Sequence, residues 1–399
     1  MNPNLSRLHP YPFEKLAKLK ADVVPPEHLS AISLGIGEPK HPSPEFVKRV
    51  IDDNLDRLAN YPTTGGMQEL RQAIADWATR RFQLQPGTLK ADGNVVPVNG
   101  TREGIFSFVQ AAIDSSRPAT VVSPNPFYQI YEGAALLAGA TPHYLPCDGS
   151  NGFIPDFDAV PEAVWRDCQI LFLCSPGNPS GAVIPRETLE QVIELADRHD
   201  FIIASDECYS ELYPDEANPP EGLLQTCAAI GRHDYARCVV FHSLSKRSNL
   251  PGLRSGFVAG DASILRAYLR YRTYHGCAMP IHNQLASIAA WQDEDHVKEN
   301  RAAYRAKFEA VVPVLSQVMR VDFPDAGFYL WPETPMSDET FARDLSAQQN
   351  VHVLPGRYLS RTIDGYNPGE NRVRMALVAP LEECVEAAER IVRFLQEED

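Results

Sequence analysis

Three loops in the middle of the sequence carry residue types that could catalyse a reaction together. They are Ser175-Pro-Gly-Asn178-Pro-Ser-Gly, Asp206-Glu-Cys-Tyr209 and Ser243-Leu-Ser245-Lys246, and each follows a short apolar run. A lysine amine can act as a nucleophile toward carbonyl groups, and nearby polar groups can orient or ionise what the amine holds. If the loops lie side by side, they predict covalent catalysis through Lys246.

These side chains match the needs of a pyridoxal cofactor. Such a cofactor requires an amine for its Schiff base, a carboxylate that keeps the ring nitrogen protonated, and hydrogen-bond donors at the ring hydroxyl. Lys246 supplies the amine and Asp206 supplies the carboxylate. Asn178 and Tyr209 supply the donors.

The phosphate of that cofactor also needs a cradle, which a helix N-terminus, hydroxyls and a guanidinium can form. Gly100-Thr101-Arg102 follows an apolar run and can offer backbone N–H groups. Ser243, Ser245 and Arg254 can offer the hydroxyls and the guanidinium.

The elements that must position these loops read as a mostly parallel sheet. Short apolar runs alternate with helical segments, which is the pattern of βαβ units, and most runs are continuously apolar, as strands covered on both faces are. Ligands of such sheets bind at the carboxyl ends of the strands, where the loops begin. The expected strands are Asn94–Asn99, Ala119–Ser123, Gln169–Ser175, Phe201–Ser205, Cys238–His242 and Gly256–Gly260.

The chain of 399 residues exceeds the size at which one core stops growing, so we expect two lobes. After about Asp261 the pattern becomes that of a small α+β lobe. Its expected elements are a helix over Asp295–Met319, strands over Gly327–Trp331, Val351–Pro355 and Arg372–Val378, and a final helix from Leu381. We predict an arm over residues 1–44 that wraps against this lobe or a partner subunit, a large domain over 45–280 and a small domain over 281–399.

The sequence resembles the class I aminotransferases of the aspartate aminotransferase fold, from Ile36-Gly37-Glu38-Pro39 to Arg374. The most specific stretch is Ser243-Leu-Ser-Lys246-Arg-Ser-Asn-Leu-Pro-Gly-Leu-Arg254, which is similar to the cofactor-lysine signature of that family. The resemblance implies an α/β large domain with a mostly parallel sheet of the seven-stranded type between helices, and a small α+β domain. It also implies pyridoxal 5′-phosphate on Lys246, amino acid and 2-oxo acid substrates, and a homodimer with shared active sites.

The same resemblance assigns further roles at the cofactor. Ser243 and Arg254 would hold the phosphate, and Tyr61 would reach it from the other subunit. Tyr128 matches the aromatic residue that stacks on the pyridine ring, although the neighbouring Phe127 is an alternative.

Other roles concern the substrate. Arg374 matches the arginine that clamps the substrate α-carboxylate, with Arg372 as the alternative. Gly37 and Asn178 are the other expected substrate contacts.

Some stretches resemble a narrower group, the proteobacterial succinyldiaminopimelate aminotransferases of lysine biosynthesis. This resemblance implies transfer of an amino group between glutamate and N-succinyl-2-amino-6-oxopimelate. Arg272, His275 and the arm from His9 to Lys15 are candidates to bind the distal succinyl group. The stretches are His9–Lys15, Ser123–Gly133, Tyr271–Gly276 and Asn367–Arg372.

Alternative activities stay open at this level. An aminotransferase of aspartate, aromatic or alanine type, a C–S lyase or a decarboxylating acyltransferase would use the same lysine and aspartate. Ser243-x-x-Lys246 has the spacing of a serine acyl-enzyme, but the Ser-Asp-Asn and Lys-Thr-Gly motifs of that class do not occur. An effector-binding module fused to a DNA-binding segment would need more chain before the fold.

Composition restricts the partners and the compartment. The net charge of −15 argues against nucleic acid or an anionic membrane as a partner. The first 20 residues match neither a signal peptide nor a membrane anchor. The eight cysteines include no Cys-x-x-Cys pair, which indicates reduced core residues in the cytoplasm. The sequence contains no His-Glu-x-x-His motif, so we expect no metal.

Overall fold

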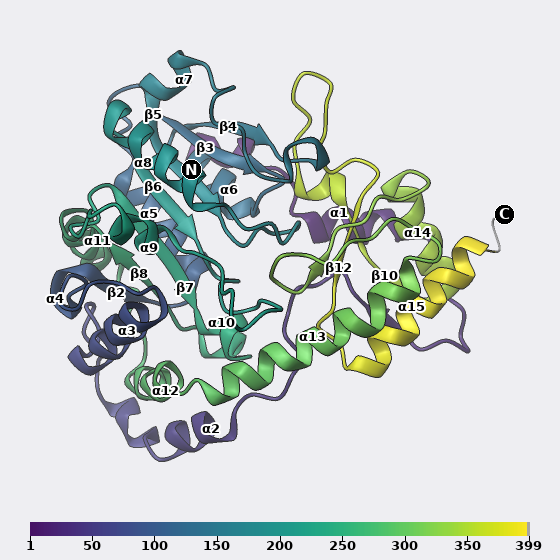
Figure 1. The fold of residues 1–399 in the computed structure, drawn as a ribbon, viewed down its shortest axis with the longest axis horizontal. Coiled ribbons are helices and arrows are strands. Elements are labelled where there is room, and N and C mark those ends of the chain that lie inside the picture. The colour runs from purple at the N-terminus through teal and green to yellow at the C-terminus, as the bar shows by residue number, and fades with distance from the viewer. Residues whose placement is uncertain (397–399) are drawn as a thin grey trace.

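A seven-stranded sheet forms the centre of the larger of two lobes in this computed structural model, which describes residues 1–396 (Figure 1). In spatial order its strands are β2 (Val95–Val98), β8 (Gly256–Gly260), β7 (Cys238–Ser243), β6 (Ile202–Asp206), β5 (Cys168–Cys174), β3 (Thr120–Asn125) and β4 (Thr141–Pro146). Only β8 runs antiparallel to its neighbours within this sheet. The mostly parallel α/β sheet predicted from the sequence is confirmed.

The edge strand β4 is absent from the sequence-based prediction. Its residues, Thr141-Pro-His-Tyr-Leu-Pro146, mix polar and apolar types and are mostly not buried, and the strand pairs only with β3. An edge strand with one neighbour need not be continuously apolar, so the criterion that finds the buried strands passes over this one.

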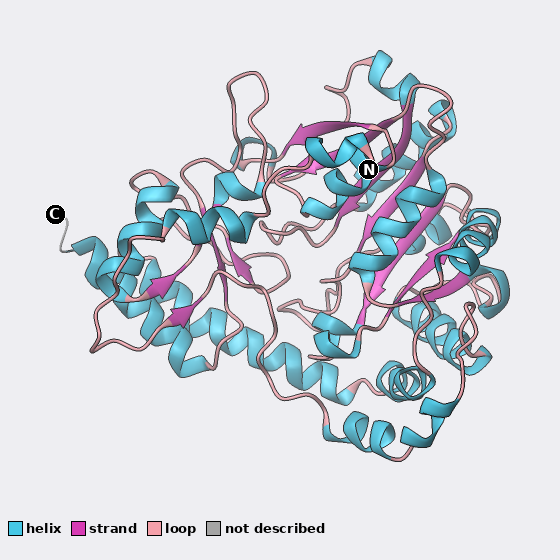
Figure 2. Cartoon of the chain, turned by 180° about the vertical axis from the view of Figure 1, so that it is seen from behind, coloured by secondary structure: helices cyan, strands magenta, loops and turns pink. Residues whose placement is uncertain are grey.

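Helices cover both faces of the sheet (Figure 2). They are α2 (Glu45–Asp52), α3 (Gln68–Arg81), α4 (Ala91–Asn94), α5 (Thr101–Ala112), α6 (Gln129–Leu137), α7 (Glu162–Asp167), α8 (Arg186–His199), α9 (Leu223–Ala229), α10 (Leu244–Arg247), α11 (Ala262–His275) and α12 (Ile281–Gln292). On one face Leu171, Ile203 and Val240 pack with α3, α8, α9 and α12. On the other face Phe172 and Ala204 pack with α5, α6 and α11, which explains why these strands are apolar throughout.

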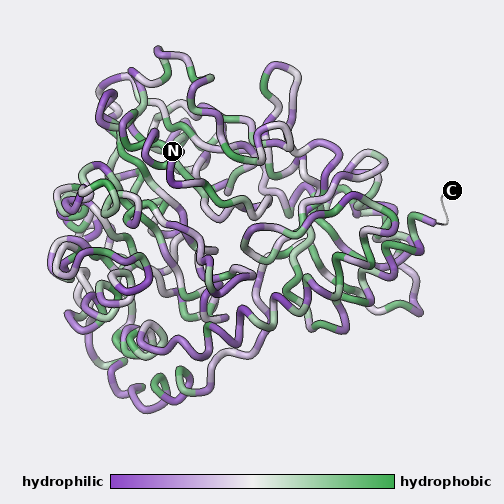
Figure 3. Tube along the Cα trace, viewed as in Figure 1, coloured by the Kyte–Doolittle hydropathy of each residue, from purple (hydrophilic) through white to green (hydrophobic). Residues whose placement is uncertain are grey.

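The small lobe combines the arm with the C-terminal part of the chain. Its elements are α1 (Pro12–Leu19), β1 (Ile32–Ser33), α13 (Asp295–Leu315), β9 (Tyr329–Leu330), α14 (Asp338–Gln349), β10 (Val351–His352), β11 (Leu354–Pro355), β12 (Val373–Ala376) and α15 (Leu381–Gln396). β1 pairs with β10, and β11, β12 and β9 form a separate antiparallel sheet. The single strand expected over Val351–Pro355 is therefore two short strands in different sheets. Ile32 and Leu34 of the arm lie in the small-lobe core, and Figure 3 shows hydrophobic stretches inside each lobe.

The division between the lobes falls later than residue 281. α12 packs on α2 and α3, and its Ala286, Ala290 and Trp291 belong to the large-lobe core. The small-lobe core includes residues of α13 from Phe308 onward. We therefore infer that α13, which spans both lobes in Figure 1, contains the boundary. Among the described residues, no helix is both long enough and apolar enough to cross a membrane.

Candidate active site

The three predicted loops meet at one edge of the large sheet. β5, β6 and β7 are direct neighbours and parallel, so their carboxyl ends lie together. Cys174 at the end of β5 is in register with Asp206, and Asp206 is in register with Phe241 of β7. The loop residues Asn178 and Lys246 follow these strand ends directly.

A cavity of about 630 Å³ opens at this edge, between the large lobe, the small lobe and the arm. It contains most of the residues that the sequence nominates, from elements far apart in the chain. Those on its wall are Gly37, Thr101, Arg102, Tyr128, Asn178, Asp206, Tyr209, Ser243, Ser245, Lys246, Arg254 and Arg374.

Lys246 lies on α10, the short helix that follows β7, and its Nζ donates a hydrogen bond to the carbonyl of Gly37 in the arm. Burial, aided by the nearby Arg374, lowers the pKa of its amine to about 8, while Cys208 and Glu38 oppose this shift. A lysine with such a pKa is neutral in a much larger fraction of molecules at neutral pH than an exposed one.

Asp206 is a buried carboxylate at the base of the cavity. Its Oδ2 accepts a hydrogen bond from the Tyr131 hydroxyl (2.7 Å), and its Oδ1 accepts from the Cys208 backbone N–H (3.3 Å). Burial raises the pKa of Asp206, and no ion-pair partner is present among residues 1–396. A cationic group entering the cavity beside Asp206 would favour the ionised form.

Hydroxyls, an arginine and a helix start form a cradle at another wall. Thr101 begins α5, and Gly100 before it has a φ of +82°. A Cβ on Gly100 would lie 2.3 Å from the guanidinium of Arg254, so only glycine fits beside that side chain. Ser243 caps α10 by accepting from the Ser245 N–H (3.0 Å). This set is suited to bind a phosphate.

Arg374 projects from β12 and is 5% exposed. Its guanidinium donates to the Asn178 side-chain oxygen (3.1 Å) and to the Gly35 carbonyl (2.9 Å). Both acceptors are neutral, its Nε has no hydrogen-bond partner, and no carboxylate pairs with it in the described chain. A buried guanidinium without a counter-ion, facing a cavity, is suited to bind a carboxylate.

Tyr209 lies 2.9 Å, hydroxyl to hydroxyl, from Tyr329 of the small lobe. The Tyr329 ring also lies under the Arg374 guanidinium, 4.6 Å from its centroid. Gly37 packs so closely that a Cβ would lie 2.1 Å from the Tyr329 hydroxyl. These contacts bring the large lobe, the small lobe and the arm together at one point.

The positions of the two neighbouring aromatic residues favour Tyr128 over Phe127 as the one that would contact the cofactor ring. Tyr128 lines the cavity, whereas Phe127 is 1% exposed and stacks on Tyr144 in the core. Arg102 donates to the hydroxyls of Tyr128 (2.7 Å) and Tyr11 (3.1 Å), so it stands at the opening of the cavity and is not directed at the cradle.

Some predicted residues are not brought to this cavity. Tyr61 is fully exposed, and this single chain gives it no site to act on. Arg272 is 1% exposed and pairs with Glu103, so it is not free to bind a substrate. His275 lies 3.9 Å from the same carboxylate. Glu103, His275 and Cys277 place potential metal-ligand atoms within 4.8 Å of one another, but Arg272 already occupies the carboxylate.

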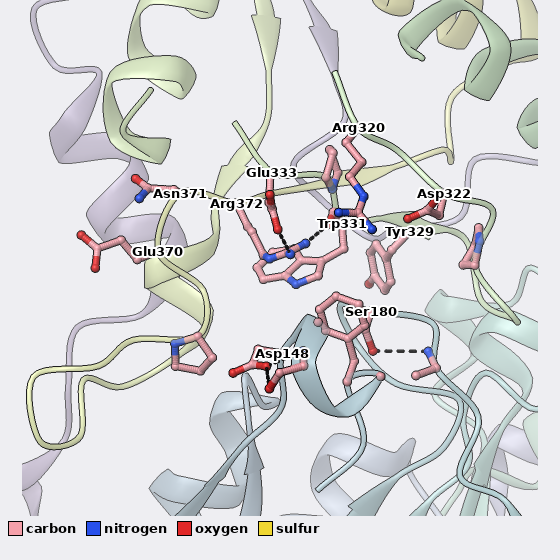
Figure 4. A pocket seen from close by; sticks show the side chains of 18 of the residues that line it. Asp148, Ser180, Arg320, Asp322, Tyr329, Trp331, Glu333, Glu370, Asn371 and Arg372 are labelled. Carbon is pink, nitrogen blue, oxygen red and sulfur yellow. Dashed lines mark hydrogen bonds and ion pairs between the residues drawn. The ribbon is translucent and has the colours of Figure 1, made fainter. Parts of the chain in front are cut away.

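Arg372 lies in a second and wider cavity of about 1160 Å³ between the lobes. Figure 4 shows its side chain paired with Glu333 beside Trp331. This pairing satisfies Arg372, whereas Arg374 remains without a counter-ion. The geometry therefore favours Arg374 as the carboxylate-binding residue.

Sequence reasoning missed two tyrosines: Tyr131, which contacts Asp206, and Tyr329, which contacts Tyr209. Tyr131 lies in the first turn of α6, three residues after the N-cap Tyr128, and that proximity is a signal that could have found it. Tyr329 carries no such signal, because it is 120 residues from Tyr209 in the chain.

The sequence also matches a family model, described as aminotransferase class I and II, over residues 30–391. The chain belongs to this family. An aminotransferase from Neisseria meningitidis Z2491 is 49% identical, with a TM-score of 0.95 over 99% of this chain and 100% of its own. An LL-diaminopimelate aminotransferase from Nitratidesulfovibrio vulgaris (strain DSM 19637 / Miyazaki F) is 33% identical over 98% of each chain. A probable N-succinyldiaminopimelate aminotransferase from Thermus thermophilus is 26% identical, with a TM-score of 0.83 over 96% and 100% of the two chains.

Class I aminotransferases depend on pyridoxal phosphate, so the predicted cofactor is confirmed at the level of the family. The residues of this chain fit that cofactor. Asp206 is a buried carboxylate without an ion-pair partner in the described chain, and the missing Cβ of Gly100 leaves room for the Arg254 guanidinium of the cradle. The enclosed Lys246 amine faces the same cavity.

Proposed function

We propose that this aminotransferase transfers the amino group of N-succinyl-LL-2,6-diaminopimelate to 2-oxoglutarate, with the reverse transfer from glutamate. The observation that supports amino transfer is the meeting, in one cavity, of three groups to which residues 1–396 offer no counter-ion. They are the Lys246 amine, the Asp206 carboxylate and the Arg374 guanidinium.

Each of these groups has a distinct task. When bound, pyridoxal phosphate acts as an electron sink for negative charge at the substrate α-carbon. Asp206 keeps a proton on the ring nitrogen, and Arg374 holds the substrate α-carboxylate through two N–H groups. The Lys246 amine first anchors the cofactor and then moves the proton at the α-carbon, for which a pKa of about 8 is suited.

The succinyl form of the substrate is supported by the charge at the cavity opening. Arg102 lies there between Tyr11 and Tyr128, and it can donate to a distal carboxylate. Succinylation replaces the distal ammonium of diaminopimelate with an amide and adds a carboxylate, which a guanidinium favours. The Thermus thermophilus protein named above is described for this substrate.

A second candidate is the amino donor LL-diaminopimelate itself. The curated relatives at 31–33% identity are described as LL-diaminopimelate aminotransferases. In this chain Glu38 also lines the cavity, and its carboxylate could bind the distal ammonium that succinylation would remove. Arg102 therefore favours a substrate with a distal carboxylate, whereas Glu38 favours one with a distal ammonium.

A donor panel separates the two candidates. The holoenzyme is assayed with 2-oxoglutarate and each of N-succinyl-LL-2,6-diaminopimelate, LL-diaminopimelate, aspartate, tyrosine and alanine, and glutamate formation is measured. We expect the succinylated donor to have the highest kcat/KM. Each distal polar contact should contribute about a five- to hundredfold preference, because an unpaired polar group costs roughly 1–3 kcal/mol.

Two matched variants identify the distal contact. Arg102→Gln should selectively reduce kcat/KM for the succinylated donor, and Glu38→Gln should leave that value unchanged. If LL-diaminopimelate is preferred and Glu38→Gln impairs its use, the second candidate is correct. A preference for aspartate or tyrosine would reject both and leave an aminotransferase of other specificity.

A further inference from the structure

A row of polar side chains on α13 leads from the small lobe to the backbone of Lys246. Asn300, Tyr304 and Lys307 lie on one face of this helix, at spacings of four and three residues. All three are buried, and Lys307 is 2% exposed. None of them lines the cavity that contains the proposed catalytic groups.

His41 of the arm completes this row. The Nζ of Lys307 lies 2.7 Å from its Nε2, and its Nδ1 lies 3.0 Å from the side-chain oxygen of Asn300. The amide nitrogen of Asn300 donates to the backbone carbonyls of Lys246 (3.1 Å) and Arg247 (3.2 Å). A continuous chain of hydrogen bonds thus runs from a buried ammonium to the lysine loop.

The protons in this chain have one consistent arrangement. An ammonium only donates, so the Nε2 of His41 must accept and its Nδ1 must carry the proton. The Nδ1 proton then points at the Asn300 oxygen, which leaves the Asn300 amide nitrogen to donate to the two carbonyls. Turning the Asn300 amide over would set its oxygen against those carbonyl oxygens.

A second proton on His41 would break the arrangement. It would remove the acceptor for Lys307 and place two cations side by side in a buried site. Burial holds the pKa of His41 below its usual value, and Lys307 lowers it further. Within residues 1–396 no carboxylate pairs with Lys307. The titratable groups close to the row include Tyr304 and Cys384, which face Lys307, and Tyr329, which is close to Tyr304. Glu38 and Arg374 act on Lys246 beyond the end of the row.

The arm contacts Lys246 at a second point. Gly37, four residues before His41, accepts a hydrogen bond from the Lys246 Nζ. The ring of His41 also packs against Tyr304, with centroids 4.6 Å apart. The same short segment thus restrains both the side chain and the backbone of Lys246.

We propose that His41 is a positioning residue for Lys246. His41 is held as the neutral Nδ1–H tautomer between Lys307 and Asn300. In this state it fixes the α10 backbone relative to the Gly37 carbonyl. Its protonation in acid loosens both the α10 backbone and the Gly37 segment. This inference rests on the proposed role of Lys246 as the reactive lysine.

Three variants of the holoenzyme test the inference. His41→Phe keeps the packing on Tyr304 but removes both hydrogen bonds, so kcat should fall about tenfold with KM little changed. The pH at which the visible absorbance of the bound cofactor changes should also shift. His41→Gln can accept and donate without titrating, so it should keep wild-type kcat near about pH 8 and move the acid limb of the pH profile to lower pH.

Lys307→Met removes the cation that a second proton on His41 would oppose. The pKa of His41 should rise, but its protonation should no longer disturb the row, so the acid limb should move to lower pH. Melting of the apoenzyme across pH gives a readout that is independent of activity. Because the folded-state pKa of His41 is lowered, this residue should make wild-type stability fall as pH falls below the usual histidine range, and His41→Gln should lose that component.

His143→Gln is the matched control, because burial also lowers the pKa of His143 on β4, outside the cavity. It should leave kcat, the absorbance titration and the acid limb unchanged.

A wild-type kcat and absorbance titration in His41→Phe, or a His41→Gln variant as impaired as His41→Phe, would overturn the inference. If His41→Phe fails to fold, the shifts to lower pH expected for both His41→Gln and Lys307→Met still decide it. Activity in Lys246→Ala would instead reject the proposed function.

Discussion

The three charged groups at the centre of the cavity are unusual because the described chain gives none of them a counter-ion. Asp206 has hydrogen bonds only to Tyr131 and Cys208, and Arg374 binds only neutral oxygens. Buried charges without partners are costly, so such an arrangement indicates sites where a ligand supplies the missing charge. A cofactor that brings a ring cation for Asp206 and an aldehyde for Lys246, together with a substrate carboxylate for Arg374, would engage all three.

The role of Asp206 can be tested by removing its charge. Asp206→Asn should retain the cofactor but lower kcat by about a hundredfold or more, because the amide cannot stabilise a proton on the ring nitrogen. Steady-state kinetics and the absorbance of the bound cofactor are the measurements. Tyr131→Phe is the matched variant: it removes one hydrogen bond that lowers the Asp206 pKa and should cost much less. Equal activity of Asp206→Asn and wild type would reduce Asp206 to a structural residue.

Sequence alone could nominate Lys246, Asp206, Asn178 and Tyr209, because each follows a buried strand and their loops share one edge. It could not decide which way neighbouring side chains point. Arg372 and Arg374 are two residues apart, yet one pairs with Glu333 and the other faces the cavity. Only the packed lobes distinguish them.

At the scale of elements, α13 carries both stability and function. Its length is largely predictable, since Asp295–Leu315 falls within the expected helix, but its buried polar face is not. Asn300, Tyr304 and Lys307 are buried because the arm crosses the helix there, and His41 comes from 266 residues earlier than Lys307. No local pattern reports a contact of that kind.

The buried Lys307 should cost the fold stability. Burial lowers its pKa to about 8, so between about pH 8 and the usual lysine value the folded chain binds fewer protons than the unfolded chain. Wild-type stability should therefore rise with pH across this window. Lys307→Met should be more stable than wild type at neutral pH, by about 1–3 kcal/mol after the lost hydrogen bond is deducted, and the difference should shrink above pH 8.

Thermal or denaturant unfolding of the apoenzyme at neutral and alkaline pH measures this difference. A variant that is less stable than wild type at neutral pH would show that the hydrogen bond to His41 outweighs the cost of the buried charge. Increased stability together with an acid limb displaced to lower pH would identify Lys307 as a residue that lowers the stability of the fold and makes the enzyme sensitive to acid.

At the scale of the whole molecule, the large lobe exposes several large hydrophobic side chains that a single chain does not cover. Leu58 is 69% exposed, Tyr274 is 86% exposed and Tyr61 is 100% exposed. Single exposed hydrophobic residues are ordinary, but an aromatic side chain proposed to bind phosphate has no function in solvent. We therefore propose that the enzyme is a homodimer in which Tyr61 completes the partner's cavity, as the family resemblance implies.

Subunit mixing tests this proposal. Lys246→Ala should be inactive, and Tyr61→Ala should have strongly reduced activity because the phosphate loses a hydroxyl donor. In hybrids of the two variants, one site combines the intact Lys246 of one chain with the intact Tyr61 of the other. Random pairing of equal amounts makes half of the dimers hybrid, each with one intact site of two, so activity should recover to about a quarter of wild type. Tyr274→Ala in place of Tyr61→Ala is the control for a general loss of the interface. If light scattering shows a monomer, or if mixing restores nothing beyond the sum of the separate variants, Tyr61 acts within its own chain or not at all.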